Sequence, residues 1–461
     1  MRMSLSDIAR NTQAVGDYAL FTDLTVTGVK TDSRLVVPGD LFVCLPGQRF
    51  DGHQFAWEAV HRGASALLVE RPLFDFSGEV PILLVKNTLR ALGQLAASWR
   101  SHFQGQVLGV TGSAGKTTVK EFLSSMLRVR GEVGKNYKNW NNELGLSLSI
   151  LSFSGQEKYW VLEAGISEKG EMDILGRILK PNLVVIVNVG PVHLQGLGDL
   201  KGVVREKGRL LSYLSPGGTA VLGADSLEIQ SLVPMRDDIR LVCFSTRDPE
   251  ADYFGGCLET SLCKSVFSLR LNKIKVGVEI RYPGRFMLEN VLAAATAAHI
   301  LGLEAEAIQA GPLAADLPEH RCQVHSLRGF RIIDDCYNAN PLAMHCIISD
   351  CRKMEPAGPL VLVLGEMKEL GAQAPEAHRN LGELAAASRC AQLIYFGDFS
   401  HEVETGFTQG RGEGGFVRVS DKREFLSAWR GLGLNEGIVL FKGSRGCGLE
   451  KFVSALVQEL S

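Results

Sequence analysis

The segment Val110–Thr118 reads Val-Thr-Gly-Ser-Ala-Gly-Lys-Thr-Thr, and these residue types and spacings suit it to holding the phosphates of a nucleotide. It lies between a predicted strand and a predicted helix, where backbone N–H groups at the helix start can donate to phosphate oxygens. Lys116 would reach the β- and γ-phosphates, and the hydroxyl of Thr117 would bind Mg²⁺. The usual pattern has glycine where this chain has Val110, so the loop is a variant. The flanking strand and helix favour ATP binding over a glycine turn that happens to precede a lysine.

Three polar residues further along the chain could add to such a site. Glu163 ends a predicted strand, and a carboxylate at the carboxyl end of a parallel strand points toward the nucleotide crevice. His193 follows the next apolar run, but Mg²⁺ prefers oxygen ligands, so taken alone this residue fits a capping or core histidine. Lys207 lies in a predicted helix, and taken alone it fits a solvated lysine. His193 and Lys207 therefore gain a functional role only if they belong to a wider pattern of motifs along the chain.

The elements that must position these residues alternate between strands and helices, which predicts an α/β fold. We expect a small N-terminal α/β domain over 1–86, a central doubly wound parallel sheet over 87–313 and a Rossmann-like domain over 314–461, with Gly311-Pro312 as the linker before the last domain. The predicted strands span 41–45, 66–69, 82–85, 107–110, 160–163, 183–189, 331–334, 360–364, 393–396 and 437–441. The predicted helices span 55–62, 88–103, 119–128, 201–210, 288–301, 342–354, 376–388, 421–430 and 448–460.

Length and composition restrict the class of protein. The 461 residues suffice for three domains, and 49 Lys and Arg against 51 Asp and Glu give a net charge of −2. That balance argues against a nucleic-acid-binding protein, which needs a cationic surplus. The ten cysteines form no paired or zinc-ligand spacing, as is typical of a reducing compartment. With neither a signal peptide nor an apolar helix long enough to span a membrane, we expect a cytoplasmic monomer.

Taken together, the motifs resemble those of the Mur ligases, the ATP-dependent amide ligases of peptidoglycan precursor synthesis. The resemblance covers essentially the whole chain. The matching segments, in family order and spacing, are Thr111–Thr118, Asn139–Gly145, Glu163-Ala-Gly, Asn188–His193 and Glu206-Lys207.

Within that family, the C-terminal motifs resemble the members that join D-alanyl-D-alanine to a UDP-N-acetylmuramoyl-tripeptide. These motifs are Asp334–Pro341, Leu364–Gly371 and Lys442–Arg445, while Thr31–Arg34 and Gly47–His53 resemble the domain that binds the uridine nucleotide end. The Asp-Asn-Pro-Arg segment of the preceding enzyme of the pathway is absent. The chain departs from the family pattern at Phe286 and Met287, where His-Asn is usual, and at Cys336, where serine is usual.

The resemblance implies that ATP phosphorylates a substrate carboxylate and that the dipeptide amine attacks the acyl phosphate. It implies two Mg²⁺ ions, the first on Thr117 and Glu163 and the second on His193 and a carbamylated Lys207. Lys116, Lys207 and His193 would be the catalytic residues. The other nucleotide contacts would be Thr111, Gly112, Ser113, Ala114, Gly115, Thr118, Asn142, Asn290, Arg321 and Asp335. The substrate contacts would be Ser33, Arg34, Arg49, Asp51, His53, Asn338, Asn340 and Arg445.

The sequence also leaves other functions open for the chain, and other roles for some of the predicted site residues. A phosphate-loop NTPase that acts as a switch is one, although the Asn-Lys-x-Asp motif of guanine-selective switches is absent. A ligase of the same chemistry with another substrate, such as folate polyglutamylation or an earlier Mur step, is the second. Arg321 and Asp335 could form an ordinary surface ion pair, and Arg445 could be an ordinary loop arginine.

Overall fold

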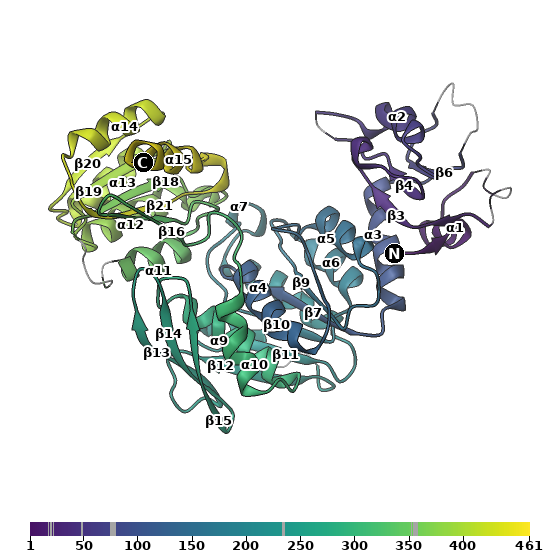
Figure 1. The fold of residues 1–461 in the computed structure, drawn as a ribbon, viewed down its shortest axis with the longest axis horizontal. Coiled ribbons are helices and arrows are strands. Elements are labelled where there is room, and N and C mark those ends of the chain that lie inside the picture. The colour runs from purple at the N-terminus through teal and green to yellow at the C-terminus, as the bar shows by residue number, and fades with distance from the viewer. Residues whose placement is uncertain are drawn as a thin grey trace.

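Three sheet-based units follow one another along the chain, and in the computed structural model the N-terminal and C-terminal units lie on either side of the central one (Figure 1). The structure describes residues 1–16, 18, 21, 23–47, 49–73, 80–232, 236–351, 353 and 358–461. The predicted three-unit α/β fold is confirmed. Among these described residues, no helix combines the length and the apolar character needed to cross a membrane.

The N-terminal unit is built on a four-stranded parallel sheet. Its strands, in spatial order, are β3 (Gly28–Lys30), β4 (Asp40–Val43), β5 (Ala66–Val69) and β6 (Ile82–Leu84). Helix α2 (Ala56–His61) packs Ala56 and Ala59 against Phe42 of β4. A short antiparallel pair, β1 (Met3–Ser4) and β2 (Thr25–Val26), flanks α1 (Leu5–Thr12). Helix α3 (Thr88–His102), capped by Asn87, leads into the central unit as predicted.

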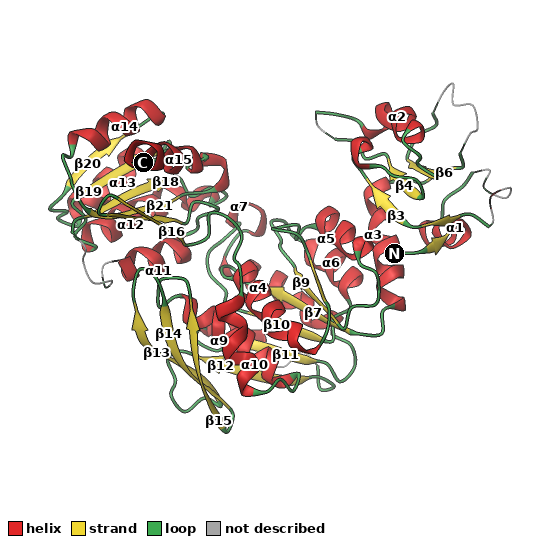
Figure 2. Cartoon of the chain, viewed as in Figure 1, coloured by secondary structure: helices red, strands yellow, loops and turns green. Residues whose placement is uncertain are grey.

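The central unit contains a nine-stranded sheet with the order β15-β14-β13-β12-β11-β10-β7-β9-β8. The strand bounds are β7 (Gln106–Thr111), β8 (Val133–Lys135), β9 (Tyr159–Glu163), β10 (Leu183–Ile186), β11 (Thr219–Gly223), β12 (Arg240–Ser245), β13 (Tyr253–Thr260), β14 (Ser265–Leu271) and β15 (Ile274–Ile280). The ladder is parallel from β8 to β13, and β13, β14 and β15 form an antiparallel ribbon. The ribbon, at the edge of the unit in Figure 2, extends the predicted parallel sheet.

Helices pack around this sheet, and several of them start next to the loops that carry the predicted site residues. They are α4 (Lys116–Leu127), α5 (Glu143–Ser152), α6 (Glu171–Leu179), α7 (Leu194–Leu197), α8 (Leu200–Gly208), α9 (Met287–Ile300) and α10 (Ala305–Ala314). Helix α4 packs against α9 and α10, whereas α3 packs against α5 and α6. The buried β7, with Val107, Leu108 and Val110 inaccessible to solvent, has the continuous apolar run of a parallel strand covered on both faces.

The predicted linker at Gly311-Pro312 is wrong, because both residues lie inside α10. A Cβ added at Gly311 would come within 2.5 Å of Cγ of Met126, so the glycine allows α10 to approach α4 closely. The helix ends at Ala314, and the chain enters the last unit through the residues that follow it.

The C-terminal unit contains a six-stranded sheet with the order β16-β17-β21-β18-β19-β20, parallel except for β16. Its strands are β16 (Gln323–Leu327), β17 (Phe330–Asp334), β18 (Leu360–Gly365), β19 (Gln392–Phe396), β20 (Gly415–Arg418) and β21 (Gly437–Lys442). Its helices are α11 (Pro341–Cys351), α12 (Ala374–Ala387), α13 (Ser400–Gln409), α14 (Lys422–Gly431) and α15 (Glu450–Leu460). The order places the carboxyl ends of β17 and β21 side by side.

Candidate active site

The phosphate loop faces the C-terminal unit across a cavity of about 400 Å³. Residues of both units line it, so the fold brings together side chains that are far apart in sequence. Among the lining residues are Ser113, Ala114, Gly115, Lys116, Thr117, Thr118, Asn142, Glu163, His193 and Asn290 from the central unit. Arg321, Asp335, Asn338, Asn340 and Lys442 line it from the other side. Most of the residues predicted to contact nucleotide therefore share one cavity.

The phosphate loop begins where β7 ends at Thr111 and closes at the start of α4. Gly115, the N-cap of α4, has φ +80°, and a Cβ there would lie 1.9 Å from Oδ1 of Asn290, so only glycine fits. The ammonium of Lys116 donates to the carbonyl oxygen of Gly112 at 3.0 Å. The helix start, its N–H groups and this lysine all face the cavity, as an anion-binding loop requires.

Side chains of the neighbouring strand end hold this loop in place. Ser113 Oγ donates to the carbonyl of Gly190 at 3.0 Å, and the Gly190 N–H donates back at 2.9 Å. The N–H of Ala114 donates to Oδ1 of Asn188 at 2.9 Å. The loop is therefore preorganised by the segment that leads to His193.

Glu163, at the end of β9, has both carboxylate oxygens hydrogen-bonded. Thr117 Oγ1 donates to Oε2 and Asn141 Nδ2 donates to Oε1, each at 2.7 Å. Burial opposes ionisation of this carboxyl, but Lys116, Lys120 and Arg321 outweigh it and lower its pKa below the usual value. A carboxylate and a hydroxyl side by side form an oxygen donor set that suits Mg²⁺.

Lys120, a buried lysine of α4 with no predicted role, supports this pair indirectly. Its ammonium donates to the carbonyl oxygens of Asn136 and Lys138, both at 2.8 Å. Asn136 in turn exchanges hydrogen bonds with the backbone of Glu163 at 3.0 and 3.1 Å. The lysine therefore fixes the loop that carries Asn141 to the carboxylate.

The interpretation of Lys207 as a solvated lysine is wrong, because its side chain on α8 is inaccessible to solvent. Its Nζ donates to the carbonyl oxygen of Gly112 at 3.1 Å, the same oxygen that Lys116 contacts. Burial and the charge of Lys116 hold the pKa of Lys207 well below that of an ordinary lysine, against the opposing effect of Glu163 and Glu206. The amine therefore loses its proton far more readily than a surface lysine.

His193 lies in the left-handed region (φ +53°) at the start of α7 and contacts the C-terminal unit. Its Nδ1 pairs with Oε2 of Glu369, and the N–H of Gln195 donates to the carbonyl of Glu369 at 3.2 Å. The hydrogen bond from His193 lowers the pKa of Glu369. A carboxylate only accepts, so Nδ1 is the donor, and in the neutral imidazole the lone pair of Nε2 is left for a metal ion. Glu369 was missed from the sequence, although its segment was singled out.

On the C-terminal side of the cavity, Arg321 and Asp335 have separate partners. Asp335 accepts from the ammonium of Lys442 and from the N–H of Cys322, the latter at 3.2 Å. Arg321 lies instead over the ring of Tyr337, 4.2 Å from its centroid, and its buried Nε has no hydrogen-bond partner. The interpretation of Arg321 and Asp335 as a surface ion pair is therefore wrong.

Asn340 and Arg445, two further site residues predicted in the C-terminal unit, differ in how many contacts hold their side chains. Asn340 caps α11, accepting from the N–H of Ala343 at 2.8 Å, and its Nδ2 donates to the carbonyl of Ser113 at 3.4 Å. It therefore joins the two units at the phosphate loop. Arg445 lies at a second cavity of about 210 Å³, shared with Lys116, His193 and Asn338. Its side chain is 59% exposed, and its guanidinium lies 3.5 Å from a carboxylate oxygen of Glu450.

Part of the lining of the main cavity is apolar, and an apolar wall suits a nucleobase. Phe286 and Met287, which replace the family's His-Asn, line it together with Leu342 and Ile347. Asn290 also lines this cavity, next to Gly115 of the phosphate loop, and Asn142 caps α5 by accepting from the N–H of Gly145 at 2.9 Å.

Glu289, which also lines the main cavity, is expected to make stability depend on pH. Desolvation raises its pKa from 4.5 to about 7 despite the hydrogen bond from Nδ2 of Asn188. Because the folded-state pKa exceeds the unfolded one, folding becomes less favourable as the pH rises from about 4.5 to 7, by about 3 kcal/mol at most. Glu289→Gln should therefore raise the melting temperature at pH 8 and change it little at pH 4. Equal changes in melting temperature at pH 4 and pH 8 would contradict a raised pKa of Glu289 as the cause.

The predicted uridine-side residues lie in the N-terminal unit, and none of them lines the main cavity. His53 is buried, with Nδ1 2.7 Å from Asp51 and Nε2 accepting from the N–H of Glu70. Ser33 donates to Glu58 at 2.8 Å, Arg34 pairs with Asp32, and Arg49 is exposed. Figure 1 shows this unit across α3 from the phosphate loop, so these residues would meet a different part of a ligand.

Comparison with known proteins assigns all three units to one family. The description "Mur ligase family, catalytic domain" matches residues 25–100, "Mur ligase middle domain" matches 110–298, and "Mur ligase, glutamate ligase domain" matches 320–445. The chain is 34% identical to the UDP-N-acetylmuramoyl-tripeptide–D-alanyl-D-alanine ligase of Escherichia coli strain K12, over 94% of each chain.

Solved structures agree with the sequence matches. MurF from Acinetobacter baumannii superposes with a TM-score of 0.90 at 27% identity, over 99% of both chains. MurF from Thermotoga maritima, solved in complex with ADP, gives a TM-score of 0.82 at 28% identity, over 94% of this chain and 98% of that one. The chain belongs to the Mur ligase family of ATP-dependent ligases.

Proposed function

We propose that this Mur ligase joins D-alanyl-D-alanine to UDP-N-acetylmuramoyl-tripeptide, with ATP converted to ADP and phosphate. The observation that carries the proposal is the single cavity in which the phosphate loop, Glu163 and the C-terminal residues Arg321 and Asp335 meet. Support for the substrate comes from the full-length similarity to ligases of that name in several bacteria. In this proposal residues 1–86 bind the uridine end, 87–313 bind ATP, and 314–461 close on the nucleotide and bind the dipeptide.

The residues of the phosphate loop would bind and orient ATP. The N–H groups of Gly115, Lys116 and Thr117 at the helix start would donate to the phosphates. The ammonium of Lys116 would exchange its contact with Gly112 for a phosphate oxygen. The donor set of Thr117 and Glu163 fits a Mg²⁺ ion, which when bound neutralises phosphate charge. Arg321 would add charge from the opposite wall, and Asp335 would accept from a ribose hydroxyl.

His193 and Lys207 would serve a second Mg²⁺. An ammonium at Lys207 would repel a cation, but its lowered pKa makes the neutral amine available to attack CO₂. The lone pair of Nζ forms the new N–C bond and one proton leaves, so the side chain becomes an anionic carbamate. The lone pair left on Nε2 of His193 by the Glu369 pairing suits the same ion.

Amide formation requires activation, because a carboxylate oxygen is a poor leaving group. In the proposed reaction, an oxygen of the tripeptide carboxylate attacks the γ-phosphorus of ATP, ADP leaves, and an acyl phosphate forms. The free amine of the dipeptide then attacks the acyl carbon, and phosphate leaves as the tetrahedral species collapses. Asn338, Asn340 and Arg445 would face the dipeptide, and closure of the C-terminal unit would exclude water from the acyl phosphate.

Phosphate release is expected to require all three substrates. Purified protein is incubated with ATP, Mg²⁺, UDP-N-acetylmuramoyl-tripeptide and D-alanyl-D-alanine, and each is omitted in turn. Release should fall to background when either peptide is missing, and the product should be the pentapeptide. Release that needs neither peptide would support the NTPase switch, and release with a single amino acid in place of the dipeptide would support another ligase substrate.

A further inference from the structure

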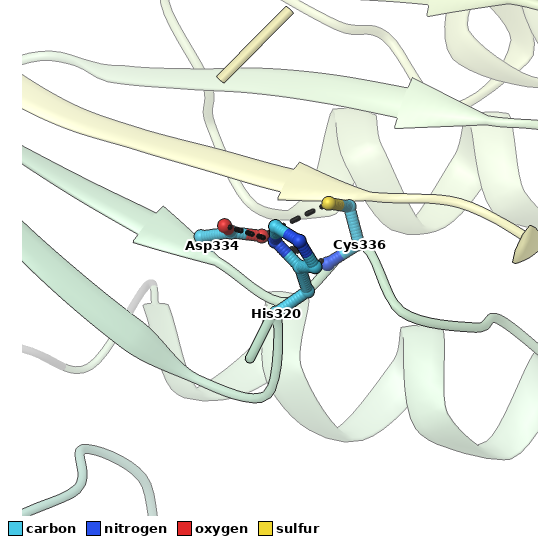
Figure 3. Close-up of side chains that lie close together, drawn as sticks. All are labelled: His320, Asp334 and Cys336. Atoms are coloured by element: carbon cyan, nitrogen blue, oxygen red, sulfur yellow. Dashed lines mark hydrogen bonds and ion pairs between the residues drawn. The ribbon is translucent and has the colours of Figure 1, made fainter. Parts of the chain in front are cut away.

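A histidine, an aspartate and a cysteine meet where the chain enters the C-terminal unit (Figure 3). Nδ1 of His320 lies 2.7 Å from Oδ2 of Asp334, and Sγ of Cys336 lies 2.9 Å from Oδ1 of the same carboxylate. One ligand atom from each residue lies within 4.8 Å of the other two. We propose that these three side chains form a binding site for a thiophilic divalent cation such as Zn²⁺, separate from the nucleotide cavity.

The donor chemistry selects the class of ion. Imidazole nitrogen, thiolate sulfur and carboxylate oxygen are the ligands that Zn²⁺ takes in proteins, whereas Mg²⁺ avoids sulfur and nitrogen. Three protein ligands leave one position of a tetrahedral ion for water. The side chain of Asp334 is 2% exposed and that of His320 is 26% exposed, so the open position would be on the histidine side.

The charge around the cluster also favours a cation. Of the two neighbouring carboxylates, Asp335 is paired with Lys442 and Glu450 with Arg445. In the part of the chain that the structure describes, the basic group paired with buried Asp334 is His320. Burial and the charge of Asp334 raise the pKa of Cys336, so without an ion the thiol stays protonated and donates to that carboxylate.

Binding of a Zn²⁺ ion at these three side chains can be written so that charges and protons balance. A Zn²⁺ ion would displace the thiol proton to solvent, and the imidazole proton would move from Nδ1 to Nε2. Two positive charges would then meet one thiolate and one carboxylate, so the buried group becomes neutral. The step involves no oxidant or reductant, and it releases one proton for each ion bound.

The position of the cluster gives the ion a structural consequence. Arg321 follows His320 directly, and Asp335 lies between Asp334 and Cys336, so both cavity residues adjoin ligands. The N–H of Tyr337 already donates to the carbonyl of His320 at 3.1 Å. An ion would therefore reinforce the hydrogen bonds that already join the entry segment to the end of β17, and would hold these two residues in place.

Cobalt titration of the full-length protein tests the site directly. After chelator treatment and gel filtration, Co²⁺ should bind with a thiolate-to-cobalt charge-transfer band that saturates at one ion per chain and disappears when Zn²⁺ is added. Cys336→Ser should remove the band, and His320→Gln should weaken cobalt binding at least about tenfold. Cys390→Ser, which changes another buried thiol of the same unit, should leave the charge-transfer band and the affinity for cobalt unchanged.

Two outcomes would overturn the proposal. One is a wild-type protein without the band, and the other is a Cys336→Ser variant that keeps it. Thermal unfolding shows whether each variant is folded. If Cys336→Ser does not fold, proton release by the wild-type protein in weak buffer decides: about one proton per Zn²⁺ is expected, and none would refute thiolate ligation.

Discussion

Lys207→Ala is expected to lower kcat by about 1,000-fold or more while leaving ADP binding within a few-fold of wild type. The reason is charge, because Lys207 is buried beside Gly112 of the phosphate loop, where its carbamate would supply an anion for the second Mg²⁺ ion. Alanine leaves a cavity in place of the long side chain. Formate or acetate at millimolar concentration should enter that cavity and restore part of the activity. Phosphate release at saturating substrates, with and without each acid, is the measurement.

The control for this prediction lies on the same helix. Lys201 belongs to α8 but is exposed, so Lys201→Ala should keep wild-type kcat and show no response to the acids. Lys207→Arg should be as inactive as alanine and should not be rescued, because the guanidinium fills the cavity and stays charged. If neither formate nor acetate restores activity to Lys207→Ala, the carbamate interpretation fails even when the loss of activity is confirmed.

The parallel core of the fold could be predicted because its signal is local. β7, β9 and β10 are continuous apolar runs, and the helices after them have an apolar period of three to four residues. The ribbon β13–β15 was missed, because β14 and β15 alternate between buried and exposed residues and carry no continuous apolar run. β20 and α13 were missed for a related reason, since β20 has only two apolar residues and α13 is mostly polar.

The candidate site likewise has a part that local spacing predicts and a part that depends on contacts between residues far apart in sequence. The phosphate loop is read from spacing alone, since its glycines, lysine and threonine lie within one turn and one helix start. The pairing of His193 with Glu369 joins residues 176 positions apart, and that of Lys442 with Asp335 joins residues 107 apart. The first pair depends on how the central and C-terminal units meet, and the second depends on β17 and β21 being neighbours in the C-terminal sheet. No local pattern encodes either arrangement. The burial of Lys207 likewise follows from the packing of α8 behind the loop, and the helical period did not indicate it.

Lys116→Met is expected to lower kcat by about 1,000-fold, because the ammonium is the loop's own positive charge beside the transferred phosphoryl group. ATP affinity should fall by only about tenfold, since the backbone N–H groups of the loop remain. Methionine keeps the length and the apolar stem, so the half-buried side chain should still pack. Steady-state phosphate release gives kcat, and calorimetry with ADP gives the affinity. A loss confined to affinity, with kcat unchanged, would show that the lysine binds nucleotide without assisting the transfer.

The same substitution also tests the coupling between the two lysines. Both donate to the carbonyl oxygen of Gly112, and the charge of Lys116 is one of the causes that lower the pKa of Lys207. Removing that charge should raise the pKa of Lys207, so less of it is neutral and less can react with CO₂ at a given pH. The carbamate signal from ¹³C-labelled CO₂, followed by NMR as the pH is raised, should therefore appear at higher pH in Lys116→Met than in wild type. An unchanged midpoint would mean that burial alone sets the reactivity of Lys207, and that the two lysines act independently.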